Sequence, residues 1–317
     1  MILTDYFRSE KDSTWDIAKQ CGVSHGVIRL PENQDFDLTN KSHWQTVYKR
    51  FIDNGITPII IEPMPNAVHD HIKSGDCQRD ESIEKVLKMF PIMQEFGITT
   101  ICFNWMAHIG WLRTKHDILE RGGATVTGFS LADFQAKQGV SITEQQLWEN
   151  YEYFLRAVIP TAEKYGIKLA LHPDDPPLER LGGVSRIMVS VENIKKAIYG
   201  IYPSESLGVT MCQATYYMMG ADLEKTITEL AEKIWFVHFR NATGVKTDFR
   251  ETFHDNGDLD MAKLLRLYTR LGINAPIRVD HVPTLKGENT EVAGYAAQGR
   301  LFAIGYLKGL LQVIERS

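Results

Sequence analysis

The chain has 317 residues, 44% of them hydrophobic, and a net charge of −5 with acidic and basic residues interspersed. It is long enough to bury a large core, and no basic face suggests a nucleic-acid partner. No apolar run approaches the length needed to cross a bilayer, and the N-terminal MILTDYFRSEKDSTWD does not resemble a signal peptide. Four widely spaced cysteines without a CxxC pair are typical of reduced thiols in a cytoplasmic protein.

Short apolar runs rich in Ile and Val alternate with amphipathic segments along the chain. The predicted strands are 25–30, 57–62, 98–104, 168–173, 207–212, 234–239, 250–255 and 276–281. The predicted helices are 42–55, 81–97, 143–166, 190–200, 221–233 and 259–272, and a last segment from 292 to about 314 closes the chain. We expect Ser42 to cap the first of these helices and Gly55 to end it.

This order of elements predicts an α/β fold. Continuous apolar strands that alternate with helices favour a parallel sheet, and eight strand–helix units favour a closed (β/α)8 TIM barrel over an open sheet. The pattern at 250–255 is the weakest of the eight. A Gly-, Thr- and Ser-rich region from about Arg113 to Ser141 is predicted to be a long loop over the site. No linker is visible, so we predict a single catalytic domain over 1–317.

The predicted strands end in polar side chains. In such a barrel the chemistry takes place at the C-terminal ends of the strands. The residues found there are Glu62, Asn104, His172, Cys212, His238, Arg240, His254, Asp255, Asp280 and His281. A hydrophobic core needs none of them, so we expect them to gather at one site.

Four of these residues suit a metal ion. His172, Cys212, His238 and Asp280 supply two imidazoles, a thiolate and a carboxylate. This set suits a divalent transition metal better than magnesium or calcium and leaves zinc, iron and manganese open. Taken singly, each residue also fits a structural role: a turn cap for His172, a small buried side chain for Cys212, a core histidine for His238 and an ion pair with Arg278 for Asp280. Their shared placement favours the metal site.

Other residues near the strand ends suit proton transfer. His281 follows Asp280 where the chain turns, and histidine titrates near neutrality. Tyr295, after a Gly-containing loop, could supply a phenol, although a helix-packing tyrosine fits the pattern equally well. Asp174 and Asp175 either support the metal or close a proline-framed turn through Asx hydrogen bonds.

Several longer motifs are typical of one known family. They are EPMP (62–65), HDHIKSG (69–75), ICFNWM (101–106), LALHPDDPP (169–177), TMCQAT (210–215), VHFRN (237–241), ETFHDNGDLDM (251–261) and RVDH (278–281). In these motifs the chain resembles the mannonate dehydratase family, in the xylose-isomerase-like TIM-barrel superfamily. HPDDPP is specific to that family, and HFR and the FHD-x-GD segment reinforce it. The family's DHG pattern is Asp280-His281-Val282 here, a departure at the substrate end of the site.

The resemblance implies conversion of D-mannonate to 2-keto-3-deoxy-D-gluconate and water with Mn²⁺ or Fe²⁺. It implies that His172, Cys212, His238 and Asp280 hold the ion, and that His281 and Tyr295 act as acid and base, without saying which does which. The candidate substrate-binding residues are Arg240, Arg113, Asn104, Asp174 and Glu62. A guanidinium binds a carboxylate through two parallel hydrogen bonds, so Arg240 or Arg113 suits the acid group.

Other functions remain open at this point. A sugar isomerase or epimerase on the same barrel usually places paired carboxylates on its metal. A nuclease needs a multi-zinc cluster and a basic face, which the charge balance disfavours. A non-catalytic sugar-acid-binding homologue would fill its pocket without forming product. The expected partner is a small-molecule sugar acid, with no nucleic acid and no membrane. A homo-oligomer also stays open, because the apolar C-terminal helix could pack on a second copy.

Overall fold

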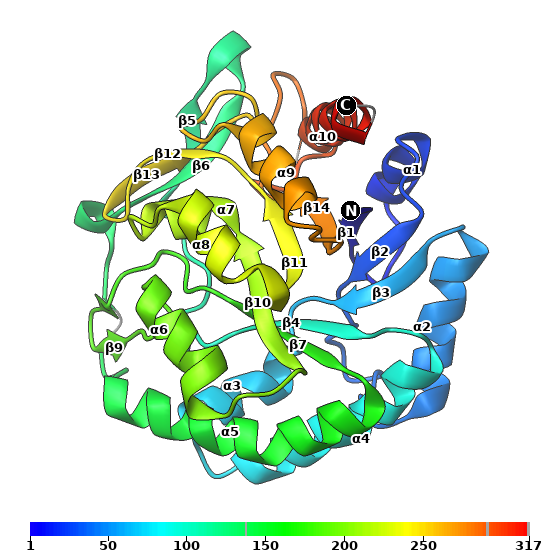
Figure 1. The fold of residues 1–317 in the computed structure, drawn as a ribbon, viewed down its shortest axis with the longest axis vertical. Coiled ribbons are helices and arrows are strands. Elements are labelled where there is room, and N and C mark those ends of the chain that lie inside the picture. The colour runs from blue at the N-terminus through cyan, green and yellow to red at the C-terminus, as the bar shows by residue number, and fades with distance from the viewer. Residues whose placement is uncertain (137, 290–291, 316–317) are drawn as a thin grey trace.

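The computed structural model describes residues 1–136, 138–289 and 292–315, so the predicted domain boundary at Ser317 lies outside the described residues. Within them, eight parallel strands close into a barrel in the order β1-β14-β11-β10-β7-β4-β3-β2, and helices surround them (Figure 1). The barrel strands are β1 (Ile2–Phe7), β2 (His25–Ile28), β3 (Thr57–Ile61), β4 (Thr100–Asn104), β7 (Lys168–His172), β10 (Leu207–Cys212), β11 (Ile234–Phe239) and β14 (Pro276–Val279). The predicted (β/α)8 barrel is confirmed.

Two of the predicted strands need correction. The first barrel strand is β1, which the prediction missed because Thr4 and Asp5 interrupt its apolar pattern, although both side chains are buried. The predicted strand 250–255 is wrong: only its first two residues are extended, and they end β13 (Asp248–Glu251), which lies outside the barrel. The strands β7, β10, β11 and β14, which lead to the four predicted metal ligands, are therefore the fifth to eighth of the barrel and lie side by side.

The helices mostly follow the predicted segments. They are α1 (Ser13–Gln20), α2 (Lys41–Asp53), α3 (Asn66–Ser74), α4 (Arg79–Glu95), α5 (Glu144–Tyr165), α6 (Val191–Lys195), α7 (Gln213–Met218), α8 (Leu223–Glu229), α9 (Met261–Arg270) and α10 (Ala297–Glu315). α1, α3 and α7 were not predicted. The cap of α2 is Asn40 rather than Ser42, because the Asn40 side chain accepts a hydrogen bond from the Ser42 backbone amide at 3.0 Å. Among the helices of the described residues, none has the length and apolar composition required to span a bilayer.

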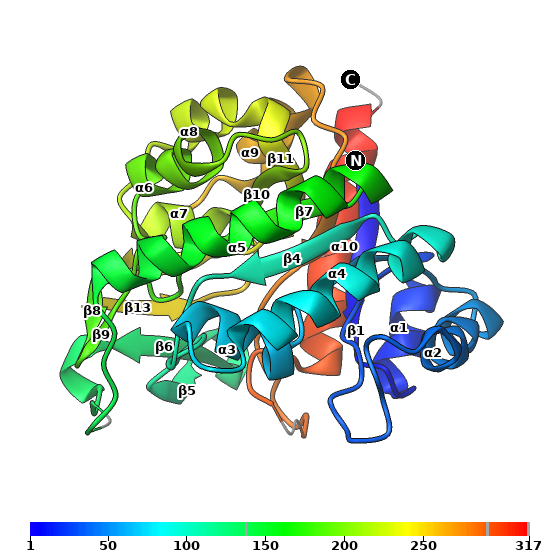
Figure 2. The same ribbon diagram turned by 90° about the horizontal axis from the view of Figure 1, so that it is seen from below.

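The region predicted as a long loop forms a β-hairpin instead. Its strands, β5 (Lys115–Leu119) and β6 (Thr125–Ser130), join β12 (Ala242–Val245) and β13 in an antiparallel sheet of order β12-β13-β6-β5. We call this the outer sheet; it lies at one side of the barrel (Figures 1 and 2). Gly128 permits the close pairing, since a Cβ there would lie 2.7 Å from the carbonyl oxygen of Phe249. A short ribbon of β8 (Arg180–Leu181) and β9 (Val184–Ser185) follows β7.

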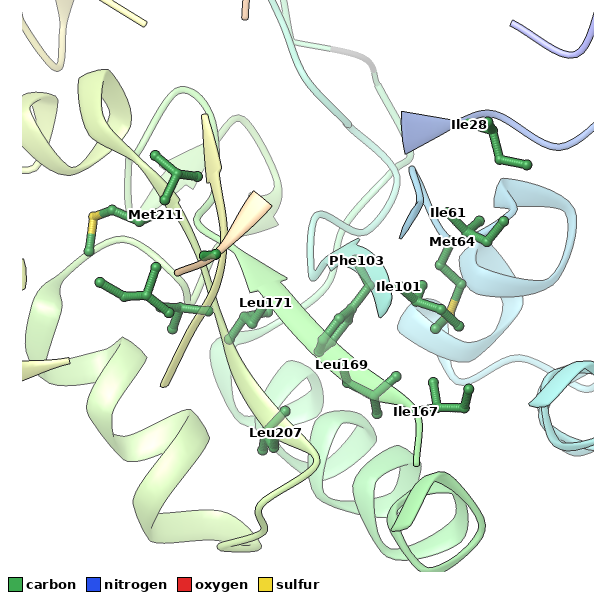
Figure 3. Close-up of a cluster of buried hydrophobic side chains, with 14 of the residues drawn as sticks. Ile28, Ile61, Met64, Ile101, Phe103, Ile167, Leu169, Leu171, Leu207 and Met211 are labelled. Carbon is green, nitrogen blue, oxygen red and sulfur yellow. The ribbon is translucent and has the colours of Figure 1, made fainter. Parts of the chain in front are cut away.

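Alternation along the strands decides which side chains reach the site. In β7, Leu169 and Leu171 belong to the large core that also contains helix residues, and Figure 3 shows them beside Phe103 of β4. Ala170 instead packs inside the barrel with residues such as Phe236. Because successive side chains of a strand point to opposite faces, the residue two positions after Ala170, which is His172, also points inward. The same argument places the end residues of the neighbouring strands above the barrel interior.

Candidate active site

A cavity of about 770 Å³ lies at the C-terminal ends of the barrel strands. Most of the sequence-predicted site residues line it: Glu62, Asn104, His172, His238, Arg240, Asp280, His281 and Tyr295. Cys212 is fully buried beside it. Arg113 and Asp174 are buried too, but they are not part of the cavity lining. The structure therefore brings most of the predicted site together.

His172, Cys212 and His238 form one group that could hold a metal ion. One ligand atom of each lies within 4.8 Å of the others. Strand pairing produces this arrangement, since Cys212 is in register with His238 and β7 flanks β10 on the other side. Both ring nitrogens of His238 are buried without a hydrogen-bond partner. Because buried polar groups are normally satisfied, these nitrogens indicate that a ligand belongs there.

Asp280 lies at the edge of this group. Its Oδ2 atom is 3.6 Å from Nδ1 of His238, and its Oδ1 atom is 2.8 Å from Nη1 of Arg278. The ion pair considered from sequence is thus present, and it does not remove the carboxylate from the site. Burial would raise the pKa of Asp280, but His281 and Arg278 hold that pKa well below its usual range. The group is a carboxylate, which is the form that binds cations.

A second group with ligand atoms within 4.8 Å consists of Glu62, Cys102 and His238. Glu62 Oε1 approaches His238 Nε2 at 3.0 Å without hydrogen-bond geometry. Arg278 donates two hydrogen bonds to the Glu62 carboxylate, at 2.9 and 3.0 Å. Burial would raise the pKa of Glu62, but Arg278 and His238 lower it well below its usual range. Because the guanidinium offsets the Glu62 charge, this group is the weaker cation site.

Two buried arginines converge on Asp175, the second aspartate of HPDDPP. Arg113 donates to its two carboxylate oxygens at 2.7 and 3.0 Å, and Arg240 donates from both Nη atoms at 2.9 Å. Arg240 also donates to the Thr215 hydroxyl at 2.8 Å, and that hydroxyl contacts Cys212 Sγ at 3.2 Å. A chain of contacts therefore joins HPDDPP to Cys212 beside the cavity.

Asp174 has a structural role that differs from the Asx turn considered from the sequence. Its Oδ2 atom accepts hydrogen bonds from the backbone amides of Ile187 and Met188, at 3.2 and 3.1 Å. Burial raises the pKa of its carboxyl group. The side chain thus ties the HPDDPP segment to backbone 13 and 14 positions further along the chain, so these hydrogen bonds are not those of the predicted Asx turn.

His281 and Tyr295 lie next to each other in the lining of the cavity. Their ring centroids are 5.4 Å apart, and the ring centroid of Trp111 lies 4.8 Å from that of His281. His281 has a φ of 39°, in the left-handed region that non-glycine residues rarely occupy. A hydrogen bond of 2.8 Å from the amide of Val282 to the carbonyl of Gly294 braces this turn. Burial raises the pKa of the Tyr295 phenol, which therefore stays protonated.

Comparison with known proteins places this site in a family. A family model described as D-mannonate dehydratase (UxuA) matches residues 6–140 and 131–317. The chain belongs to the D-mannonate dehydratase family. A mannonate dehydratase of Streptococcus equi subsp. zooepidemicus is 30% identical over 329 residues, which cover 93% of this chain and 88% of that protein. The resemblance inferred from the motifs is thus confirmed.

Solved structures agree with the family. The crystal structure of a mannonate dehydratase from Streptococcus suis serotype 2 superposes with a TM-score of 0.90 and 28% identity, covering 100% of this chain and 94% of that one. A D-psicose 3-epimerase from Clostridium cellulolyticum H10 has a TM-score of 0.64 at 12% identity and covers 99% of both chains. The second likeness shows the barrel fold alone.

Three residues at or beside this cavity were not predicted from the sequence. Cys102 was missed because only the last residue of its strand was considered, although it lies two positions before Asn104, on the same inward face, and packs with Ala170 and Phe236. Glu251 was placed in a barrel strand that does not exist. Lys73, on the unpredicted helix α3, lines the cavity and pairs with Asp70 at 2.8 Å. The alternation of β4 could have identified Cys102. The motifs HDHIKSG and ETFHDNGDLDM contain Lys73 and Glu251 but do not indicate a role for either.

Proposed function

We propose that this chain is a hydro-lyase that converts D-mannonate to 2-keto-3-deoxy-D-gluconate and water. One observation carries the proposal: His172, Cys212 and His238 converge within 4.8 Å beside the cavity that His281 and Tyr295 line. Membership of the D-mannonate dehydratase family supports the same reaction.

The proposed cofactor is Mn²⁺ or Fe²⁺, held by His172, Cys212, His238 and Asp280. The fit rests on the mixed nitrogen, sulfur and oxygen donor set and on the two unsatisfied ring nitrogens of His238. When bound, such an ion supplies a Lewis acid that polarises the substrate oxygen atoms it contacts. The thiolate donor argues against Mg²⁺ and Ca²⁺, which prefer oxygen ligands.

Dehydration requires one proton acceptor and one proton donor. A proton leaves C2, the hydroxyl group leaves C3 as water after it gains a proton, and the resulting enol becomes the 2-keto product. His281 and Tyr295 line one cavity, so one bound substrate can contact both. The protonated phenol of Tyr295 suits the donor that assists the departing hydroxyl, which leaves His281 as the acceptor.

The proposed substrate-binding residues fall into those that line the cavity and those that do not. Arg240, Asn104 and Glu62 line the cavity and are proposed to bind the sugar acid. Among these three, the guanidinium of Arg240 is the group that suits the substrate carboxylate. Arg113 and Asp174, which are outside the lining, are proposed to support the substrate site only indirectly.

We propose that the chain acts as a single catalytic domain in the cytoplasm, on a small-molecule sugar acid. The free state of Cys21, Cys77, Cys102 and Cys212 is consistent with a reducing compartment. Assembly into a homo-oligomer stays a prediction.

The test is a turnover assay. Purified protein is loaded with Mn²⁺ or Fe²⁺ under reducing conditions and given D-mannonate, and the 2-keto-3-deoxy acid is measured. Product from the wild type and none from His281→Asn supports the proposal. An isomerised sugar acid would instead indicate an isomerase or epimerase. Bound D-mannonate with no product would indicate a sugar-acid-binding homologue.

A further inference from the structure

Glu251 is a buried carboxylate that contacts the ring of His281 from outside the cavity. Its side chain is 3% exposed, and it is not part of the cavity lining. Oε1 contacts Nδ1 of His281 and accepts hydrogen bonds from Nε and Nη2 of Arg113, at 3.2 and 2.6 Å. Oε2 accepts a hydrogen bond from the Thr127 hydroxyl at 2.6 Å. A buried charge persists only with partners of this kind, so both carboxylate oxygens are held in place.

The outer sheet supplies this arrangement. Glu251 ends β13, Thr127 lies in β6, and these two strands pair antiparallel. Thr125 of the same β6 forms a bridge to Thr284, with two backbone hydrogen bonds of 2.9 Å. The outer sheet therefore contacts the His281 ring through Glu251 and the loop after His281 through Thr125. A sheet that takes no part in closing the barrel thus fixes a residue at the barrel mouth.

Two contacts at Nδ1 of His281 demand opposite hydrogen positions. An ionised carboxylate only accepts hydrogen bonds, so Glu251 requires a proton on Nδ1. A guanidinium only donates, and Nη1 of Arg240 lies 2.9 Å from the same nitrogen. The Glu251 contact is the closer one, and Arg240 has acceptors of its own in Asp175 and Thr215, at 2.9 and 2.8 Å. At the other ring nitrogen, Asp280 Oδ1 lies 3.6 Å from Nε2, which is too far for a hydrogen bond. The geometry therefore favours the Nδ1–H form that donates to Glu251.

We infer that Glu251 is a positioning residue for His281: it holds the ring proton on Nδ1 and so leaves Nε2 as the proton acceptor of the neutral ring. In a neutral imidazole one nitrogen carries the hydrogen and the other accepts, and a partner on the first decides the form. This inference rests on the proposed function, because it gives His281 the acceptor role in that reaction. Glu251 acts through His281 and does not contact substrate.

The informative variant is Glu251→Gln. An amide can turn its NH₂ group toward Nδ1, which favours the opposite form with the hydrogen on Nε2. We expect kcat for D-mannonate to fall about 10- to 100-fold, the usual range for partners that orient a ligating or reacting histidine. KM and bound metal should change little. Glu251→Asp keeps an acceptor-only side chain and should retain more activity than Glu251→Gln. Asp248→Asn, an exposed change on the same strand, is the matched control and should leave kcat unchanged.

A second measurement does not depend on turnover. Imidazole ¹⁵N spectra are recorded on the metal-free full chain under conditions in which the His281 signals show a neutral ring, and these signals are assigned with His281→Asn. The inference predicts a protonated Nδ1 and an unprotonated Nε2 in the wild type. A protonated Nε2 in the wild type would overturn it, whatever the activity and even if the Gln variant fails to fold.

The two measurements separate the two proposals. The predicted ¹⁵N pattern without turnover of D-mannonate by the wild type would reject the proposed function and keep the positioning role. Turnover by the wild type together with unchanged kcat in Glu251→Gln would reject the positioning role alone.

Discussion

Arg113 and Asp175 form a bidentate ion pair in the protein interior, with Nη1–Oδ1 and Nη2–Oδ2 distances of 2.7 and 3.0 Å. The two side chains are 0% and 1% exposed. Burial would raise the pKa of Asp175, but Arg113 and Arg240 hold that pKa well below its usual range, so the pair is charged. It ties the segment before the outer sheet to the HPDDPP turn beside the cavity.

Removal of one partner should therefore destabilise the protein. Arg113→Met removes one of the two guanidinium groups that pair with buried Asp175 and leaves Glu251 without the hydrogen bonds from Arg113; loss of one partner of a buried ion pair typically costs about 3–5 kcal/mol. Urea unfolding measures the free energy of unfolding. Lys246→Met is the control, because Lys246 pairs with exposed Glu179 at 2.6 Å and such pairs contribute about 0–1 kcal/mol. Equal losses in the two variants would contradict a special role for the buried pair.

Loss of a proposed metal ligand should abolish metal retention without unfolding the chain. In His172→Ala, metal content after dialysis should fall by more than about 100-fold, since even loss of a supporting residue costs about 10- to 100-fold in affinity. Elemental analysis measures the metal, and circular dichroism checks the fold. His71→Ala, which removes a histidine paired with Asp76 at 2.8 Å, should keep its metal. Normal metal content in His172→Ala would reject this ligand.

His254 should make stability depend on pH. It is fully buried, its Nε2 atom lies 2.8 Å from the carbonyl oxygen of Phe239, and burial lowers its pKa to about 4. Between pH about 6.5 and 4 the unfolded chain binds a proton that the folded chain does not. The free energy of unfolding should thus decrease as the pH falls through this window, by up to about 3 kcal/mol.

The matched variant for that test is His254→Gln, which keeps a donor for Phe239 and does not titrate. Urea unfolding at several pH values should show a smaller decrease in this variant than in the wild type. Identical pH profiles would mean that His254 does not carry the effect.

Gly299 of α10 should be intolerant of a side chain. A Cβ there would lie 1.9 Å from the carbonyl oxygen of Pro283, in the loop that follows His281. Gly299→Ala should displace that loop, lower kcat and cost about 1–3 kcal/mol of stability. Gly305→Ala, on the same helix with open space around its Cβ, should be neutral or stabilise by up to about 1 kcal/mol. The turnover assay gives kcat and thermal unfolding gives the stability of each variant. Equal kcat and equal stability in the two variants would contradict the steric argument.

Local patterns predicted the barrel because its central strands are continuously apolar and bounded by helices with clear caps. Because the strands alternate with helices and run parallel, the predicted order of elements also placed His172, Cys212, His238 and Asp280 at one end of the barrel. β1 was missed because Thr4 and Asp5 break the pattern; the Thr4 hydroxyl donates to the carbonyl of Ile277 at 3.0 Å, and Asp5 pairs with Arg300 at 3.3 Å. Those partners are distant in sequence, so no local window contains them.

The outer sheet was beyond local prediction for a similar reason. The sequence of its hairpin resembles a loop, because the hairpin is completed by pairing with β13, which lies more than a hundred residues further along the chain. Arg113 was expected to bind substrate because guanidinium groups suit carboxylates, but in the fold its acceptors are Asp175 and Glu251. Residue type indicated the chemistry, while the choice between a substrate and an internal partner depended on tertiary contacts.

Metal occupancy and turnover measured together test most directly whether an ion at the proposed site is required for the dehydration of D-mannonate. Metal-free wild-type protein is titrated with Mn²⁺ under reducing conditions, and bound metal and the rate of D-mannonate dehydration are measured at each step. We predict that the rate rises in proportion to bound metal and levels off at one ion per chain, whereas Cys212→Ser neither retains the ion nor forms product. Product formation that does not follow bound metal, or metal binding without any loss of water from D-mannonate, would contradict this prediction.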